Sequence, residues 1–185
     1  MERVGYNKAF KSSLLLGIAG RLRDEYIPIL NFLIEYSSEH ERKIGFWSLP
    51  RIIFPVIEEV ADILNVNKED FLSEKLKVDY GWVYWMIYRN GLLHGEQPHS
   101  LSYKGIDIDW ALSLRAAGHR VDYINGAILL GLDLNRLYHD LLGVVDAEAK
   151  KEENKVIISY PIFVEIKTKD NSKLIRQLEE LISRH

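Results

Sequence analysis

Apolar residues recur at intervals of three and four along the first part of the chain, which is the spacing of an amphipathic helix. This pattern predicts a long helix over residues 8–36, with a kink at Pro28 because a proline lacks the N–H that a helix interior needs. A polar stretch over residues 37–43 follows it. A second helix is predicted from Ser48, which can cap its start, to about Asn65.

Two shorter helices are expected next. Asn67, with Asp70 three residues later, is typical of a capped start and predicts a short helix that ends near Leu76. Asp79 is expected to cap another helix over residues 80–93. That segment is apolar on most sides, so we expect it to be buried.

The middle of the chain is rich in turn-forming residues over 95–109 and is expected to be a loop, with a possible short strand at residues 106–109. A short helical piece over residues 110–117 is expected to end at Gly118. A long helix is then predicted over residues 122–150, with two neighbouring apolar stripes. One stripe needs the rest of the helices as its partner, and a second subunit is a candidate partner for the other.

The end of the chain changes character. Residues 156–166 have the β-branched and aromatic content of a strand, which Pro161 confines to a sheet edge or divides. Apolar residues over 174–182 predict a final amphipathic helix. The predicted fold class is therefore mainly α, a bundle of four to six helices over residues 1–154 with a small β-containing extension over 155–185 that packs on the same domain.

Composition narrows the possible functions. The 185 residues contain no cysteine, which excludes disulfides, thiolate nucleophiles and cysteine-based metal sites. A formal net charge of −3 argues against a surface that is basic all round, so any nucleic-acid binding must come from a local patch. The apolar run over residues 13–20 is too short for a signal peptide or a membrane span and is followed by charged residues at helical spacing. These features predict a cytoplasmic protein without a membrane segment.

One short motif stands out at the end of the predicted buried helix: Arg89, Asn90 and, four residues later, His94. As R-N-x-x-x-H it resembles the signature of the HEPN (higher eukaryotes and prokaryotes nucleotide-binding) superfamily. The resemblance implies a HEPN-like helical bundle and a homodimer in which Arg89 and His94 of both subunits line one cleft. It further implies a metal-independent RNA endonuclease, of the kind found as a toxin or defence effector with a neutralising antitoxin or operon partner. Many HEPN domains instead bind a nucleotide or a protein without catalysis, and that alternative stays open.

The chemistry of RNA cleavage asks for the same residue types. His94 can act as acid or base because the pKa of histidine lies nearest to neutral pH, and Arg89 can bind a phosphate through its planar fork of donors. Asn90 lies four residues before His94, so on a helix its amide faces the imidazole and can orient it. Arg89 and His94 are five residues apart and diverge by about 140° on a regular helix. They come together only if the helix loosens, which is cheapest at Gly91 or Gly95.

Other polar residues outside the motif are candidates for substrate binding. A basic group that can bind substrate phosphate consists of His99, Arg115, His119 and Arg120, and its alternative is an ordinary solvated surface. The histidines lack the spacing of metal ligands, and no cofactor-binding motif occurs, so neither a metal nor a cofactor is expected. A purely structural role for the motif is also open. In that case His94 caps its helix, and Arg89 forms an ion pair with Glu58, Glu59 or Asp62.

Overall fold

The computed structural model describes residues 6–40, 47–94, 98–115 and 117–161. The chain divides into two units, residues 11–156 and residues 1–10 with 157–185. In the second unit, the described part is one antiparallel pair of strands, β1 (Tyr6–Phe10) and β6 (Ile157–Pro161). A strand was predicted around β6, whereas the residues of β1 were expected to begin a helix. The predicted helix over 174–182 lies outside the described residues.

The larger unit begins with one continuous helical run, α1 (Lys11–Arg21), η1 (Leu22–Tyr26) and α2 (Ile27–His40). Its buried stripe agrees with the predicted amphipathic helix and includes Leu15, Ile18, Leu22 and Leu30. The η1 segment is a wider π-helical turn just before Pro28. Because proline cannot donate to the carbonyl of the preceding turn, a local widening accommodates it where a kink was expected.

The middle helices follow the sequence pattern closely. Helix α3 (Ser48–Leu64) ends at Asn65, whose left-handed backbone (φ 56°) forms the C-cap. Asn67 caps α4 (Lys68–Asp70) by accepting from two backbone N–H groups, and the π-helical turn η2 (Phe71–Lys75) continues it. The motif helix consists of α5 (Gly81–Tyr84), η3 (Trp85–Asn90) and α6 (Gly91–His94). Asp79 does not cap this helix, because the N-cap position is occupied by Tyr80 in a left-handed conformation.

A four-stranded sheet lies where a loop with one short strand, at residues 106–109, and two helices were predicted; that short strand is confirmed as the start of the second strand of the sheet. Its strands are β2 (Leu101–Tyr103), β3 (Ile106–Ser113), β4 (Arg120–Ile124) and β5 (Ala127–Asp133), in the order β2-β3-β5-β4. The β3–β5 pair is parallel and the other two pairs are antiparallel. Helix α7 (Leu134–Ala149) follows β5 directly, and a short 3-10 turn, η4 (Glu152–Asn154), comes after it.

The mainly α fold class predicted from the sequence is therefore wrong. Residues 106–113, 120–124 and 127–133 are strands inside the larger unit, not parts of a purely helical HEPN-like bundle with β structure only at its end. Two tight turns cause this. Lys104-Gly105 and Asn125-Gly126 all have positive φ, as a two-residue hairpin turn requires, and such turns reverse the chain where a helix would have continued.

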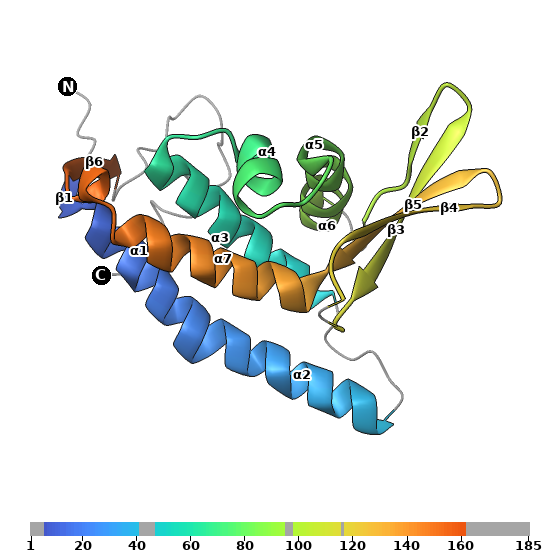
Figure 1. Ribbon diagram of the computed structural model, residues 1–185, viewed down its shortest axis with the longest axis horizontal. Helices are drawn as coiled ribbons and strands as arrows, with labels where there is room; N and C mark the ends of the chain where they lie inside the picture. Colours follow the sequence, from blue (N-terminus) through green and yellow to red (C-terminus); the bar gives the residue numbers. More distant parts are fainter. Residues whose placement is uncertain (1–5, 41–46, 95–97, 116, 162–185) are drawn as a thin grey trace, which may run out of the picture. The chain divides into compact units, whose positions relative to one another are not determined.

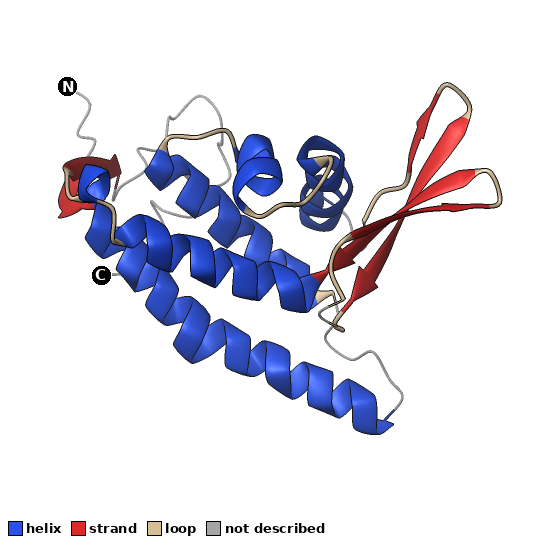
Figure 2. Cartoon of the chain, viewed as in Figure 1, coloured by secondary structure: helices blue, strands red, loops and turns tan. Residues whose placement is uncertain are grey.

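Helices and sheet share one core (Figures 1 and 2). Tyr84 and Tyr88 on the motif helix each direct a hydroxyl at two strand carbonyls, which share its single proton: those of Arg120 and Gly131 for Tyr84, and those of Ala111 and Leu130 for Tyr88. Helix α7 packs against α1 and α3. Its apolar residues Leu134, Leu137, Tyr138, Leu141 and Val145 are all buried within this chain. Of the residues predicted to form two stripes on one long helix, these are thus covered by the chain's own elements, whereas Leu142 and Val144 are only partly buried and Ile124, on β4, is exposed.

Candidate functional site

The predicted motif lies at the end of the α5–η3–α6 helix. The segment Trp85–Asn90 is π-helical, which widens the helix just before the residues between Arg89 and His94. The sequence favoured a loosening of this helix at Gly91 or Gly95. The π-helical segment instead ends at Asn90, the residue before Gly91. The described backbone reaches His94 at the end of α6, but the side chain of His94 is outside the described part, so its distance to Arg89 stays a prediction.

Arg89 is held by a carboxylate from another helix. Its Nη2 lies 2.9 Å from Glu58 Oε2 on α3, and its guanidinium carbon lies 5.9 Å from the centre of the Trp85 ring. The side chain is 22% exposed, and its buried Nε has no hydrogen-bond partner among the described residues. Of the three carboxylates proposed as ion-pair partners, Glu58 is the one that binds Arg89; Glu59 pairs with Arg21 instead.

A second cation binds the same carboxylate. Lys68 Nζ lies 2.8 Å from Glu58 Oε1 and 5.2 Å from the centre of the Trp85 ring. Burial alone would raise the pKa of Glu58, but the hydrogen bonds from Lys68 and Arg89 and their charges lower it, so the carboxylate is ionised at neutral pH. The cluster therefore has two positive charges against one negative charge. Lys68 was not among the residues selected from the sequence, because only the fold brings the start of α4 next to the motif.

Asn90 and Gly91 have distinct local roles. The side-chain amide nitrogen of Asn90 lies 3.4 Å from the sulfur of Met86, a weak acceptor. A Cβ on Gly91 would lie 2.5 Å from the backbone nitrogen of His99 and 2.8 Å from the Cα of Pro98. The chain after the motif therefore folds back directly over Gly91, where the His99 N–H donates to the Ile87 carbonyl at 3.2 Å.

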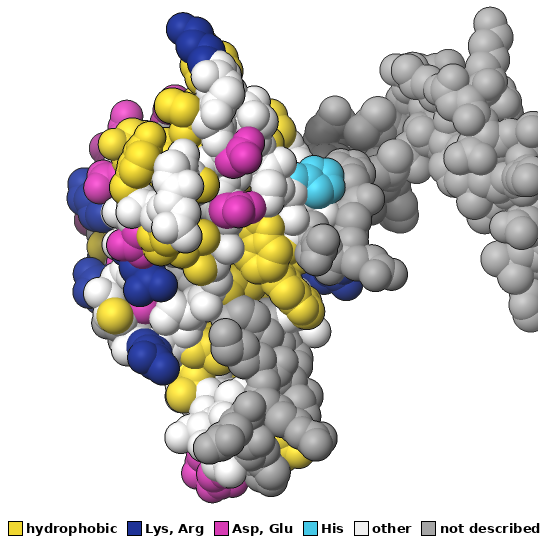
Figure 3. Space-filling view, turned by 90° about the vertical axis from the view of Figure 1, so that its right-hand side faces the viewer, with side chains coloured by type: hydrophobic (Ala, Val, Ile, Leu, Met, Phe, Trp, Pro, Cys, Tyr) yellow, Lys and Arg dark blue, Asp and Glu magenta, His cyan; other side chains and the backbone are white. Residues whose placement is uncertain are grey.

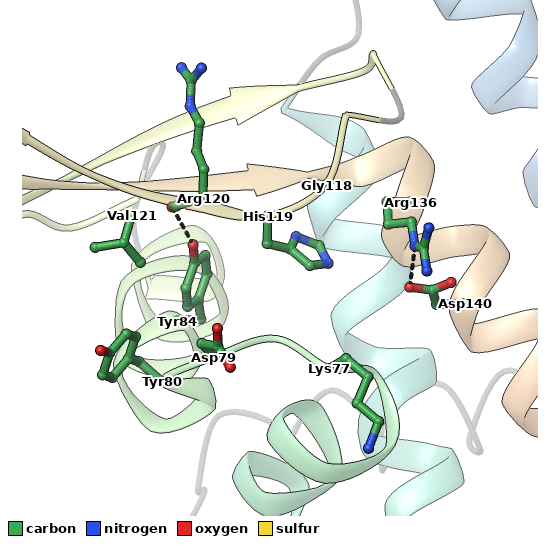
Figure 4. Close-up of a pocket in the computed structure, with 10 residues that line it drawn as sticks. All are labelled: Lys77, Asp79, Tyr80, Tyr84, Gly118, His119, Arg120, Val121, Arg136 and Asp140. Carbon is green, nitrogen blue, oxygen red and sulfur yellow. Dashed lines mark hydrogen bonds and ion pairs between the residues drawn. The ribbon is translucent and has the colours of Figure 1, made fainter.

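Two of the four basic residues proposed to bind substrate phosphate line a common pocket and two do not. His99 and Arg115 are exposed and are not among the residues that line the pocket containing His119. His119 and Arg120 line a common pocket, but their side chains diverge: Figure 4 shows the guanidinium of Arg120 directed away from the pocket. Arg120 pairs with Asp122 at 3.0 Å and packs over Gly131, leaving its carbonyl to accept from Tyr84.

This pocket has a volume of about 370 Å³ and is assembled from four segments of the chain. Its walls come from the turn before α5, from α5 itself, from the start of β4 and from α7 (Figure 4). The lining residues are Lys77, Asp79, Tyr80, Tyr84, Gly118, His119, Arg120, Val121, Arg136 and Asp140. Most were missed from the sequence. The Asn125-Gly126 turn was the available signal, because it would have placed the start of α7 at Asp133 and thus Arg136 on its first turn.

Asp133 fixes the part of the pocket around His119. Its fully buried carboxylate accepts from the backbone N–H groups of Ala117, Gly118 and Arg136, which caps α7 and shapes the loop before β4. Its own backbone N–H donates to His119 Nδ1 at 3.2 Å. Nδ1 is therefore the acceptor of the ring, and Nε2 carries the proton.

The environment keeps His119 neutral. Burial lowers the pKa of its imidazole, and the nearby carboxylates of Asp133 and Asp140 offset only part of this effect. The buried Nε2 has no hydrogen-bond partner within the described ranges. At neutral pH His119 thus presents one unsatisfied N–H donor, and it is poorly suited to act as a base through Nε2.

Two features were not found within the described ranges. No group of three or more histidine and carboxylate side chains is placed to hold a metal ion, and no helix is long and apolar enough to cross a bilayer. Figure 3 shows acidic, basic and hydrophobic side chains interspersed on the face it presents. Comparisons of the chain with models of protein families, with curated proteins and with solved structures found no match.

Proposed function

We propose that the protein cleaves RNA without a metal ion at the end of the motif helix, with Arg89 binding the scissile phosphate, Asn90 orienting and His94 acting as acid or base. The observation that carries this proposal is the fixed position of the Arg89 guanidinium, which Glu58 and the Trp85 ring hold at the end of the helix. A preoriented cation stabilises the charge that develops on the phosphate oxygens without reorganising during the reaction.

The local charge supports phosphate binding in an acidic protein. Arg89 and Lys68 together exceed the charge of Glu58 by one, so a phosphate can compete with the carboxylate for both cations. In the reaction the ribose 2′-oxygen attacks phosphorus and the 5′-oxygen leaves. His94 either takes the proton of the 2′-hydroxyl or gives a proton to the 5′-oxygen. The products are a 2′,3′-cyclic phosphate and a free 5′-hydroxyl. The reaction needs no metal ion.

A homodimer completes the proposal, because a second His94 would supply the other proton-transfer group. This part rests on the resemblance of R-N-x-x-x-H to the HEPN signature, as do a toxin or defence role, a neutralising partner and a cytoplasmic location. The mass of the protein in solution, measured by light scattering, tests the dimer directly.

The deciding experiment is RNA cleavage by the purified protein in EDTA. The wild type is expected to release fragments with 2′,3′-cyclic phosphate ends, and His94→Ala to slow this by about a hundredfold or more, as loss of acid–base catalysis does. His139→Ala is the matched control, because His139 is exposed on α7. Full activity of His94→Ala, or activity of the wild type that disappears with EDTA, would reject the mechanism.

The second candidate is a non-catalytic module that binds a nucleotide or a protein. The ion pair with Glu58 favours it, because a guanidinium already neutralised by a carboxylate is the arrangement of a structural arginine. This function predicts no RNA turnover by the wild type and a measurable affinity for a nucleotide or partner that His94→Ala leaves unchanged.

A further inference from the structure

The pocket that contains His119 lies at the other end of the helical run from Arg89, and its lining residues indicate what kind of ligand it would bind. Neither Arg89 nor Asn90 is among its lining residues. Its volume of about 370 Å³ lies within the range of small-molecule sites. Two of its lining residues, three positions apart in the sequence, also have a left-handed backbone.

Those two residues are Lys77 and Tyr80, with φ of 55° and 62°. A left-handed backbone is unfavourable for residues with a Cβ, and such residues tend to occur at functional sites. Tyr80 is 63% exposed, so burial of its ring does not account for the conformation. What the conformation achieves is to place an aromatic ring at one end of the pocket, next to Val121 (Figure 4).

The polar groups of the pocket lie beyond this ring. Figure 4 shows Asp79 and His119 between Tyr80 and the ion pair of Arg136 with Asp140. Asp79 is exposed to solvent, so its carboxylate can accept from ligand hydroxyl groups. His119 Nε2 offers the opposite, a buried N–H donor that lacks an acceptor.

The charges in the pocket balance. Lys77 and Arg136 are offset by Asp79 and Asp140, Arg136 is bound to Asp140 at 2.6 Å, and the guanidinium of Arg120 is directed outward. The Lys77 ammonium is bound to the Glu74 carbonyl at 2.6 Å. A polyanion gains little from such a site. An uncharged ligand with a flat ring at one end and vicinal hydroxyl groups at the other fits it better.

We propose that this pocket binds a ribonucleoside, with the base stacked on Tyr80 and the ribose hydroxyls donating to Asp79. Base stacking on an aromatic side chain tolerates different bases, and a carboxylate is a suitable acceptor for ribose hydroxyls. The inference does not depend on RNA cleavage at the motif.

The test is calorimetric titration of the full chain with adenosine, D-ribose and adenosine 5′-monophosphate. Adenosine is expected to bind with a dissociation constant below about 1 mM, a modest affinity for a ligand of this size. Ribose is expected to bind at least about tenfold more weakly because it lacks the stacked base. The monophosphate is expected to match adenosine within about threefold, because Arg136 is already neutralised.

Tyr80→Gly is the diagnostic variant, since glycine adopts the left-handed conformation without penalty and the fold is retained. Adenosine affinity is expected to fall about fivefold to a hundredfold, the range measured for loss of base stacking. Asn65→Gly is the matched control, a left-handed residue at the end of α3 that does not line the pocket, and it is expected to keep full affinity.

The inference would be overturned by no adenosine binding at 1 mM, by unchanged binding in Tyr80→Gly, or by a monophosphate that binds more than tenfold tighter than adenosine. His94→Ala separates this inference from the proposed function, because it is expected to lose RNA cleavage and to keep adenosine binding. Loss of adenosine binding in that variant would place the ligand at the motif and reject the pocket.

Discussion

The motif cluster and the His119 pocket use opposite ends of the same helical run but are built differently. Around Arg89, the chemically important residues of the motif are neighbours in the sequence, and the fold adds Glu58 and Lys68 to fix the guanidinium. The pocket instead joins side chains from segments as far apart as Lys77 and Asp140. The first kind of site can be recognised as a sequence motif, whereas the second forms only when distant segments have come together in the fold.

The largest effect is expected at the residue that organises the pocket. Asp133→Ala leaves three backbone N–H groups without their acceptor and removes the cap of α7. We expect the free energy of unfolding to fall by about 3 kcal/mol, from the loss of a cap and the exposure of buried donors. Urea denaturation checks this. A loss below about 1 kcal/mol would show that the loop before β4 does not depend on this carboxylate.

The corresponding change in the motif region is Gly91→Ala. Its Cβ would meet the backbone of Pro98 and His99, which cannot move aside as a side chain can. We expect a loss of about 2 kcal/mol, the range for overpacking. The control is Gly143→Ala on α7, where no atom lies within 4 Å of the new Cβ and a gain of about 0.5 to 1 kcal/mol is expected. Equal melting temperatures of the two variants would contradict the close packing.

Glu58→Gln sharpens the comparison within the motif cluster. The side chains of Glu58 and Arg89 are only 26% and 22% exposed, so removing the charge is expected to cost about 1 kcal/mol, allowing for partial screening by solvent. Glu59→Gln removes a more exposed pair, with Arg21, and is expected to cost less than about 0.5 kcal/mol. Chemical denaturation of both variants measures the difference, and equal losses would mean that Glu58 does not hold Arg89 more firmly than a surface pair.

The smallest effect is a pH dependence from His119. Its folded pKa is lowered from 6.5, so the unfolded chain binds a proton more readily than the folded one. The contribution of His119 to stability is therefore complete above pH 6.5 and is lost as the pH falls from 6.5 towards the folded pKa. Denaturation at pH 7.5 and 5.5 should show a smaller loss in His119→Gln than in the wild type. An identical loss in both would mean that the imidazole is not kept neutral by its surroundings.

The sequence predicted the helices whose ends carry clear local signals. Asn65 ends α3 in a left-handed conformation and Asn67 caps α4, and both were identified from their residue types. The sheet was missed because residues 127–132 form an almost continuous apolar run, which fits a buried helix as well as a buried strand. Asn125-Gly126 is typical of a two-residue hairpin turn, and it lies within the segment that the apolar spacing predicted as one helix.

For the sites, local sequence found Arg89 and the ion pair with Glu58 as one of three alternatives, and His119 as a candidate. The sequence did not indicate the roles of Lys68, Asp79 and Tyr80. Those roles depend on contacts between distant segments and on backbone conformations that the local sequence does not predict. His119 and Arg120, which were grouped from the sequence, both line the pocket, but their side chains diverge: the guanidinium of Arg120 is directed away from it, and the Arg120 side chain crosses Gly131.

The close fit at Gly91 has a consequence for how the motif itself is defined. In R-N-x-x-x-H the positions between Asn90 and His94 are written as freely variable, yet here the first of them has no room for any side chain. The spacer is thus constrained by architecture rather than by chemistry. Proteins in which the chain folds back in the same way would need glycine at this position whether or not they act on RNA.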